Sequence, residues 1–291
     1  MEETLFGGTR LNGQSPLKVP GLPVVSVITV VYNSLSLIEK TLCNVIAQTY
    51  PNIEYIVVDG GSTDGTNEII RLYETQISYW ISEPDRGIYD AMNKGLAAAT
   101  GDFVWFMNAG DLIYTADTLE KVMTGDESSG NDGYGLIYYG DTMIVDSSYH
   151  EIGLRRLRPP EVLTWQSFKK GMLVCHQAII VNRTIATPYD PRYGHSADFD
   201  WVIKALKKAQ GPRLKAQVGN KEKVSGMKGI VNTHRVLCAF LDGGHSKKNI
   251  GISLRERFHS MVSHYGLIPT VVRHVPIAVR FGWYYLKNKR F

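Results

Sequence analysis

The residues best suited to chemistry stand at the end of the segment Gly101–Asp111. Its middle, 103–107, is continuously apolar, which is typical of a buried central strand, although periodicity alone does not exclude a piece of helix. The turn Asn108–Asp111 then places a carboxylate at the strand's carboxyl end, where open α/β sheets bind ligands. Mg²⁺ or Mn²⁺ needs only one or two protein carboxylates when a substrate adds phosphate oxygens. Asp111 is therefore a candidate metal ligand; alternatively it caps the helix predicted near Asp117, or lies in a solvated loop.

Strands and helices that alternate along the chain must position this turn. The predicted strands are 24–31, 53–58, 79–81 and 101–111, and the predicted helices between them are 36–46, 68–73 and 88–99. Ser36 and Glu39 have the spacing of a capping box. Such alternation predicts an α/β fold with a mostly parallel, doubly wound sheet. The turns after the strands bring polar side chains to one edge of this sheet: Asn33, Asp59, Arg86, Asp90 and Asp111.

Two common nucleotide-binding motifs are absent from the sequence. No G-x-G-x-x-G follows the first strand, and no phosphate-cradling lysine loop is present. The loop Asp59–Thr66 instead has glycines that let a backbone approach a ligand, and hydroxyls that cap the following helix. Gly7–Leu11 is similar to the glycine-rich signature of sugar-nucleotide pyrophosphorylases, but it lacks the preceding apolar strand and one glycine. What remains resembles a nucleotide-sugar site.

Four motifs together resemble family 2 of the glycosyltransferases, which have the GT-A fold. They are Ser26–Asn33, Gln48–Glu54, Val57–Thr66 and Asp90–Gly95. The resemblance extends from Val24 to about Ser246. It implies a Rossmann-like, mostly parallel central sheet flanked by helices. It also implies transfer of a sugar from a nucleotide donor, with inversion at the anomeric carbon.

The resemblance implies roles for residues of the first half. The end of the first strand contacts the nucleotide, Asp59 hydrogen-bonds the base, and residues after the third strand line the donor pocket. The donor-binding residues implied are Thr29, Val31, Tyr32, Asp59, Arg86, Asp90, Asn93 and Asn108. Asn108–Asp111 matches the family's acidic metal-binding motif only in its last residue. Asp111 is thereby implied as a ligand of Mn²⁺ or Mg²⁺, with Asn108 as a neutral ligand or hydrogen-bond partner.

The segment Tyr189–Trp201 resembles a second family motif, in which an acidic residue at the start of a helix deprotonates the acceptor. The matching residue is Asp198, and Ala197 stands where an acidic neighbour is often found. A general base must reach the acceptor hydroxyl and be ionised at neutral pH. The alternative is that Asp198 only caps the helix 199–207, and Asp200 is expected to anchor that helix.

The remaining second half is expected to form the acceptor side. Strands are predicted at 136–141, 176–181 and 235–241, with a hairpin through 146–148 and a loop or hairpin at 211–228. His176 either binds substrate or is packed and hydrogen-bonded. The glycines of 242–246 would allow a lid to close, and His245 is a candidate contact for diphosphate or metal.

Composition points to a cytoplasmic protein. The net charge of +4, from 32 Lys and Arg against 28 Asp and Glu, does not suggest nucleic-acid binding. The three cysteines are far apart, which indicates neither a disulfide framework nor a zinc site. Residues 1–23 lack an apolar core, so we expect an irregular leader rather than a signal peptide.

The C-terminal residues combine apolar, aromatic and basic side chains. No acidic residue follows Glu256, and Arg273 and Arg280 interrupt the apolar residues too often for a bilayer span. Such a tail suits a helix lying at an anionic membrane surface, here the inner face of the cell membrane. A packing helix or a homo-oligomer interface is the alternative.

The sequence thus predicts a leader over 1–23, a GT-A domain over 24–250 and a membrane-associating helical tail over 251–291. The domain divides into a nucleotide-sugar half, 24–111, and an acceptor half, 112–250. We expect a metal-dependent inverting glycosyltransferase that moves a sugar from a UDP- or GDP-sugar to a saccharide or lipid-linked acceptor in cell-surface polysaccharide biosynthesis. A non-catalytic nucleotide-sugar-binding relative is one alternative, and a nucleotidyltransferase is another.

Overall fold

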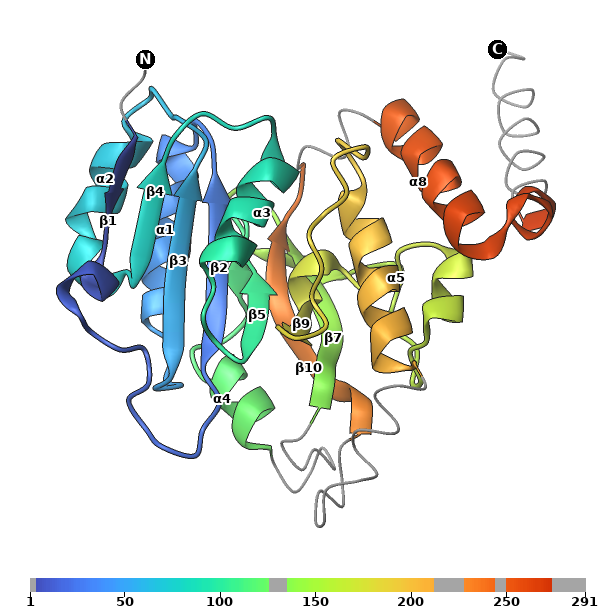
Figure 1. The fold of residues 1–291 in the computed structure, drawn as a ribbon, viewed down its shortest axis with the longest axis horizontal. Helices are drawn as coiled ribbons and strands as arrows, with labels where there is room; N and C mark the ends of the chain where they lie inside the picture. The colour runs from blue at the N-terminus through green and yellow to red at the C-terminus, as the bar shows by residue number, and fades with distance from the viewer. Residues whose placement is uncertain (1–3, 126–134, 212–227, 244–249, 274–291) are drawn as a thin grey trace.

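A mixed sheet of ten strands with helices on both faces forms the protein in the computed structural model (Figure 1). The structure describes residues 4–125, 135–211, 228–243 and 250–273. The strands are β1 (Leu5–Gly7), β2 (Val25–Val31), β3 (Ile53–Asp59), β4 (Tyr79–Ser82), β5 (Phe103–Phe106), β6 (Leu112–Ile113), β7 (Gly135–Val145), β8 (Glu151–Leu154), β9 (Ile179–Asn182) and β10 (Lys228–Leu241). The helices are α1 (Leu35–Ile46), α2 (Thr66–Leu72), α3 (Ile88–Ala98), α4 (Thr118–Thr124), α5 (Ala197–Ala209) and α8 (Ile250–Tyr265). Short 3₁₀ helices are η1 (Thr9–Asn12), η2 (Glu74–Gln76), η3 (Trp165–Lys170) and η4 (His176–Ala178).

The strand order is β1-β4-β3-β2-β5-β9-β7-β10-β6, with β8 paired to β7. β2 pairs in parallel with β3 and β5, and β3 pairs in parallel with β4. β9 then runs antiparallel between β5 and β7. The α/β class and the predicted parallel arrangement of the first half are confirmed.

β2 shows why this half folds as predicted. All seven of its residues are buried, as expected for a β-branched strand covered on both faces. α1 and α2 lie on one face of the sheet and α3 lies on the other (Figure 1). The predicted capping box at Ser36 was wrong, because α1 begins at Leu35 and its first amide donates to Asp64 in the next loop at 3.0 Å.

The N-terminal segment is not an irregular leader, and this prediction was wrong. β1 pairs antiparallel with β4 and extends the sheet. Arg10 donates to a carboxylate oxygen of Glu54 at 3.0 Å and to the carbonyl of Ala98 at 2.7 Å, which ties η1 to the core. A side chain at Gly7 would collide with the Trp80 indole, since a Cβ there would lie 2.5 Å from Nε1. Gly7 is thus explained by close packing.

The predicted boundary at residue 251 divides a packed unit, so it does not mark the end of the folded domain. α8 lies beside α5 (Figure 1) and contacts it. Tyr265 stacks on Trp165 with ring centroids 5.4 Å apart, and its hydroxyl donates to the Trp165 carbonyl at 2.6 Å. Among the residues that the structure describes, no helix has the length and apolarity to cross a bilayer.

Asp200 anchors α5 to α8, as the sequence predicted. This carboxylate is 3% exposed, and it lies 2.7 Å from Nε2 of His264 and 2.6 Å from Nζ of Lys204. Burial alone would raise its pKa, but the hydrogen bonds from His264 and Lys204 outweigh burial and lower the pKa of Asp200. The ionised carboxylate therefore stabilises the folded protein.

We expect Asp200→Asn to lower the free energy of unfolding by about 3 kcal/mol at neutral pH, because it removes the buried negative charge that pairs with Lys204 and bonds the His264 ring. The folded pKa is lowered, so this stabilisation is present above the unfolded pKa of about 3.9 and is lost as the pH falls through the folded pKa. Urea unfolding at several pH values measures both effects. The matched control is Asp117→Asn, which removes a partner of Lys121 in an exposed pair. Equal losses in the two variants, or a loss that persists in acid, would contradict the assignment.

Candidate active site

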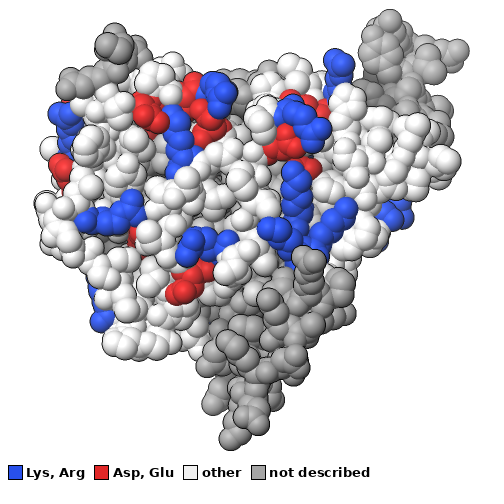
Figure 2. All heavy atoms as spheres, in the orientation of Figure 1, with Lys and Arg blue, Asp and Glu red and all other residues white. Residues whose placement is uncertain are grey.

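The carboxyl ends of β2, β3, β4 and β5 meet at one edge of the sheet, where the predicted donor residues gather. Tyr32 follows β2 directly and is 62% exposed. Its ring lies beside Gly60, the residue after β3, since a Cβ on that glycine would lie 3.3 Å from the ring. Figure 2 shows acidic and basic side chains close together along the upper part of the face in view. Tyr32 therefore offers a surface on which a planar base can stack.

Thr29 and Val31 lie beneath this surface and do not line it with their side chains. The Thr29 hydroxyl is fully buried and lies 3.1 Å from the Tyr55 hydroxyl. Val31 is buried, and its carbonyl accepts a hydrogen bond from the Gly60 amide at 2.9 Å. Contact of these two residues with the nucleotide stays a prediction. They support the site from below. Both faces of β2 are covered, so the side chains of this strand point into the core on either side of the sheet.

Asp59 is also buried, and its oxygens are occupied by donors from its own loop. One oxygen accepts bonds from the Ser62 amide at 2.8 Å and the Ser82 hydroxyl at 2.6 Å, and the other accepts from the Ser62 hydroxyl. Asn67 adds a further bond at 3.2 Å. Asp59 thus shapes the loop, and the hydrogen bond that it would accept from a base stays a prediction.

Asp85 is a carboxylate that sequence reasoning missed. One of its oxygens accepts a bond from the Gly87 amide at 2.7 Å. The other lies over Gly60, where a Cβ would come within 2.4 Å of it. This carboxylate therefore lies beside the Tyr32 surface and is only half buried. The signal in the sequence was Asp85-Arg86-Gly87, in which a side chain that bonds a backbone amide two residues on favours a turn.

Arg86 and Asp90 form a pair at the start of α3, while Asn93 has a different role. Arg86 reaches an oxygen of Asp90 at 3.2 Å with a largely exposed side chain. Partial burial raises the pKa of Asp90, but the hydrogen bonds from Arg86 outweigh it and lower the pKa. Asn93 uses its amide nitrogen and oxygen to bind the backbone of Tyr189, at 3.0 and 2.7 Å. Asn93 therefore holds the segment before α5 against α3, and its place in the donor pocket stays a prediction.

The turn Asn108–Asp111 is held rigidly after β5. Gly110 has a φ of 96°, a left-handed value that favours glycine, and its amide donates to the Thr41 hydroxyl at 2.9 Å. Asp111 is 5% exposed, and its carboxylate accepts bonds from Gln177 at 3.0 Å and from the Leu241 amide at 3.1 Å. Burial raises the pKa of Asp111 well above its usual range, although these two bonds oppose the rise. A nearby cation would favour the ionised form.

The residues present fit a hard divalent cation. Oδ1 of Asn108 is buried without a hydrogen-bond partner, so this oxygen is available to a ligand. The Asp111 carboxylate has outer partners of the kind that orient metal ligands. Over the described ranges, no group of three or more His, Cys, Asp or Glu side chains could hold a metal ion. His245 lies outside the described residues, so its predicted role has no structural account.

Asp198 lies in the first turn of α5, where the helix dipole favours a negative charge. Its Oδ1 accepts bonds from the Phe199 amide at 2.9 Å and from the Tyr89 hydroxyl at 3.1 Å. No described residue hydrogen-bonds the other oxygen, and the side chain is half exposed. Asp198 is therefore placed to accept a proton. Tyr89 was missed in the sequence because it stands in a helix more than a hundred residues earlier.

A buried aromatic cluster supports Tyr89 and Asp198. Tyr189 stacks between Tyr89 and Trp201, with ring centroids 5.5 and 5.2 Å away. Its hydroxyl lies 2.6 Å from Nε2 of His176. Burial lowers the pKa of His176 to about 4, although the charge of Asp198 opposes the shift. His176 is therefore a neutral, packed residue, which decides between its two sequence readings.

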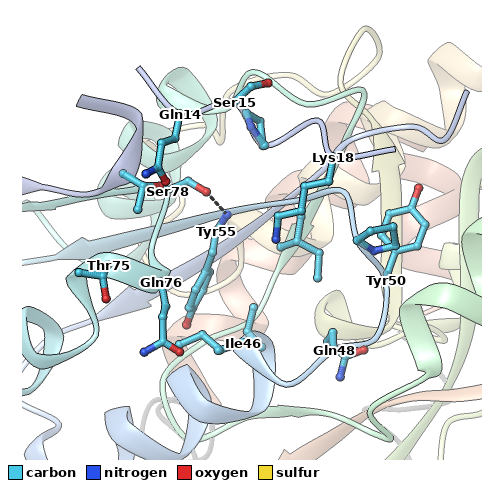
Figure 3. A pocket seen from close by; sticks show the side chains of 15 residues that line it. Gln14, Ser15, Lys18, Ile46, Gln48, Tyr50, Tyr55, Thr75, Gln76 and Ser78 are labelled. Atoms are coloured by element: carbon cyan, nitrogen blue, oxygen red, sulfur yellow. Dashed lines mark hydrogen bonds between the residues drawn. The ribbon is translucent and has the colours of Figure 1, made fainter. Parts of the chain in front are cut away.

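A second hollow lies at the opposite end of the strands. A cavity of about 290 Å³ opens where β3 and β4 begin, between the N-terminal segment and the end of α1. Figure 3 shows Gln14, Lys18, Tyr55 and Gln76 around it. It contains none of the predicted site residues. The chemistry is therefore assigned to the carboxyl edge, which holds Asp111 and Asp198.

Comparisons with known proteins identify the family of this chain. The family model described as glycosyl transferase family 2 matches residues 26–187. An uncharacterized glycosyltransferase of Mycobacterium tuberculosis, Rv1514c, is 34% identical over 63% of this chain and 69% of its own length. The putative teichuronic acid biosynthesis glycosyltransferase TuaG of Bacillus subtilis is 33% identical over 55% of this chain and 63% of its own.

The solved structures show the same fold. TarS 1–349 from S. aureus, crystallised in complex with UDP-GlcNAc, aligns with a TM-score of 0.57 at 18% identity. The alignment covers 86% of this chain and 72% of that one. This likeness supports the predicted GT-A architecture, in which the central sheet carries the site at its carboxyl edge. The chain therefore belongs to glycosyl transferase family 2 and is a glycosyltransferase.

Proposed function

We propose that this protein is a metal-dependent, inverting glycosyltransferase that uses a UDP- or GDP-sugar to extend a saccharide or lipid-linked acceptor of a cell-surface polysaccharide. The observation that carries the proposal is the pairing of Asp111, at the end of the central strand, with Asp198, whose second oxygen is free for the acceptor. The name of the TuaG relative supports a surface polymer, and the UDP-GlcNAc complex of TarS supports a nucleotide-sugar donor.

Asp198 acts as the general base. It takes the proton of the acceptor hydroxyl as that oxygen attacks the anomeric carbon from the side opposite the leaving diphosphate, so the configuration inverts. Tyr89 and the Phe199 amide hold Oδ1, which leaves Oδ2 for the hydroxyl. Both donors fix the orientation of the carboxylate before the acceptor arrives, which lowers the entropic cost of alignment.

The donor half holds the nucleotide. The exposed Tyr32 ring stacks on the base, and Arg86 offers an exposed guanidinium just before α3. Asp111 and the free oxygen of Asn108 would hold Mn²⁺ or Mg²⁺ beside the diphosphate. When bound, this ion supplies Lewis-acid stabilisation of the charge on the leaving group.

The protein works in the cytoplasm, at the inner face of the membrane. Several apolar side chains on α8 and on the residues after it are exposed to solvent: Ile250, Ile252, Leu254, Leu267, Ile268, Val271 and Val272. Arg255 and Arg273 are exposed among them, and no acidic residue follows Glu256. Apolar and basic side chains together favour an anionic membrane surface, which would bring the enzyme to a lipid-linked acceptor.

The test is release of nucleoside diphosphate from a panel of UDP- and GDP-sugars, with Mn²⁺ or with EDTA. We expect one donor to be consumed, with release at least ~10-fold faster with Mn²⁺ than with EDTA, since a bound metal contributes several kcal/mol to the transition state. Product analysis by mass spectrometry excludes a nucleotidyltransferase, which would instead consume a sugar phosphate and a nucleoside triphosphate. Tight donor binding in calorimetry without turnover, with acceptor extracts present, would replace this proposal with a binding function.

A further inference from the structure

Arg257, on α8, forms no ion pair with any carboxylate that the structure describes, and it lies over the ring of Phe199, the residue after the proposed base. The side chain is half buried, and its Nε is fully enclosed without a hydrogen-bond partner. Its guanidinium carbon lies 5.9 Å from the ring of Phe199, the residue after Asp198. Burial raises the pKa of Tyr89 well above its usual range, and the positive charge of Arg257 opposes this rise.

The adjacent residue explains how α8 comes to this place. Glu256 accepts bonds from the amides of Gly194 and His195, at 2.9 and 2.8 Å, and from the Ser196 hydroxyl at 3.1 Å. These three residues lead directly into α5. The carboxylate of Glu256 is thus occupied by these donors. Its bonds hold the turn of α8 that carries Arg257 against the amino end of α5.

Within the described part of the chain, no carboxylate forms an ion pair with Arg257. The segments on either side of α8 that the structure does not describe, 244–249 and 274–291, contain no Asp or Glu. A half-buried charge without a partner costs stability, so its presence here calls for a compensating ligand. A guanidinium binds phosphate and carboxylate groups with paired, charge-assisted hydrogen bonds.

We propose that Arg257 binds an anionic group of the acceptor, a phosphate or a carboxylate, and that this protein therefore prefers anionic acceptors. The inference rests on the proposed function, because Asp198 faces the acceptor only if it is the base. The neighbourhood of Arg257 is then the acceptor side of the site. The donor diphosphate belongs instead at the turn Asn108–Asp111.

The experiment compares acceptors that share one sugar. The probes are a neutral octyl glycoside, the corresponding octyl uronide, and the same sugar on an alkyl diphosphate. We expect Arg257→Gln to reduce the preference for an anionic over the neutral acceptor, measured as the ratio of kcat/KM values, by about 10- to 100-fold, as expected for a lost charge-assisted bond. The anionic acceptor whose kcat/KM falls in Arg257→Gln, the uronide or the diphosphate, identifies the anion that Arg257 binds. Arg257→Lys should restore part of the preference.

The matched control is Arg255→Gln, which removes an exposed positive charge from the same helix. The preference should stay unchanged in this variant. An unchanged preference in Arg257→Gln would overturn the inference, and so would a loss of affinity for the nucleoside diphosphate in place of the acceptor. Calorimetry with the anionic acceptors separates the two proposals. Binding that depends on Arg257 without any turnover by the wild type would refute the transferase function and leave the anion site standing.

Discussion

Asp198→Asn is expected to reduce kcat for sugar transfer by about 10²- to 10⁴-fold, the range that general-base catalysis supplies. The amide is nearly isosteric, so Oδ1 can still accept from Tyr89 and the Phe199 amide. The proton acceptor is lost while the shape of the site is kept. Affinity for the nucleoside diphosphate, measured by calorimetry, should therefore stay close to the wild-type value. Single-turnover kinetics would show the loss in the chemical step.

Asp190→Asn is the matched control, because it makes the same substitution eight residues earlier. Asp190 pairs with Arg192 at 2.7 Å and does not contact Asp198 or Tyr89. Its kcat should remain near the wild-type value. A wild-type rate in Asp198→Asn would mean that Asp198 only caps α5, and a different base would have to be sought. Comparable losses in both variants would point to a general disturbance of the segment before α5.

The first half of the fold was predictable because its signals are local. β2 and β3 are β-branched segments with turn residues after them, and each helix follows its strand within a few residues. The ends of the chain were not predictable in this way. β1 is only three residues long and gains its structure from pairing with β4. α8 has no capping or periodic signal strong enough to show that Asp200 and Glu256 attach it to α5.

The residues of the candidate site also differ in whether a local sequence signal indicates them. Asp111 and Asp198 were proposed from the sequence because each stands in a recognisable motif. Tyr89 and Arg257 were missed, since they stand on other helices and only the packed structure brings Tyr89 to Asp198 and Arg257 over the ring of Phe199. Asp59 and Asn93 matched motifs, yet their polar atoms serve the loop and the backbone of Tyr189. A residue in a family motif can hold the backbone in its conformation instead of contacting the ligand. The hydrogen-bond partners in the structure are needed to distinguish these two roles.

Asp111→Asn is expected to reduce metal-stimulated transfer by about 10²- to 10³-fold, because several kcal/mol of transition-state stabilisation depend on the bound ion. The amide oxygen can still accept from Leu241, but the negative charge that attracts the cation is gone. Removal of a buried carboxyl should not unfold the protein, and thermal unfolding would confirm this. Electron paramagnetic resonance of Mn²⁺, titrated with the nucleoside diphosphate present, measures the metal affinity directly.

A substitution that adds a charge at Asn108 should change Mn²⁺ affinity in the direction opposite to Asp111→Asn. Oδ1 of Asn108 is buried and has no partner, so Asn108→Asp adds a second carboxylate to the same turn without removing a hydrogen bond from that atom. Divalent affinity rises with the number of charged oxygen ligands, and Mn²⁺ should bind more tightly in Asn108→Asp and more weakly in Asp111→Asn. If both variants bound Mn²⁺ as the wild type does, the turn Asn108–Asp111 would not be the metal site. A metal-independent mechanism would then have to stabilise the leaving diphosphate through protein cations such as Arg86.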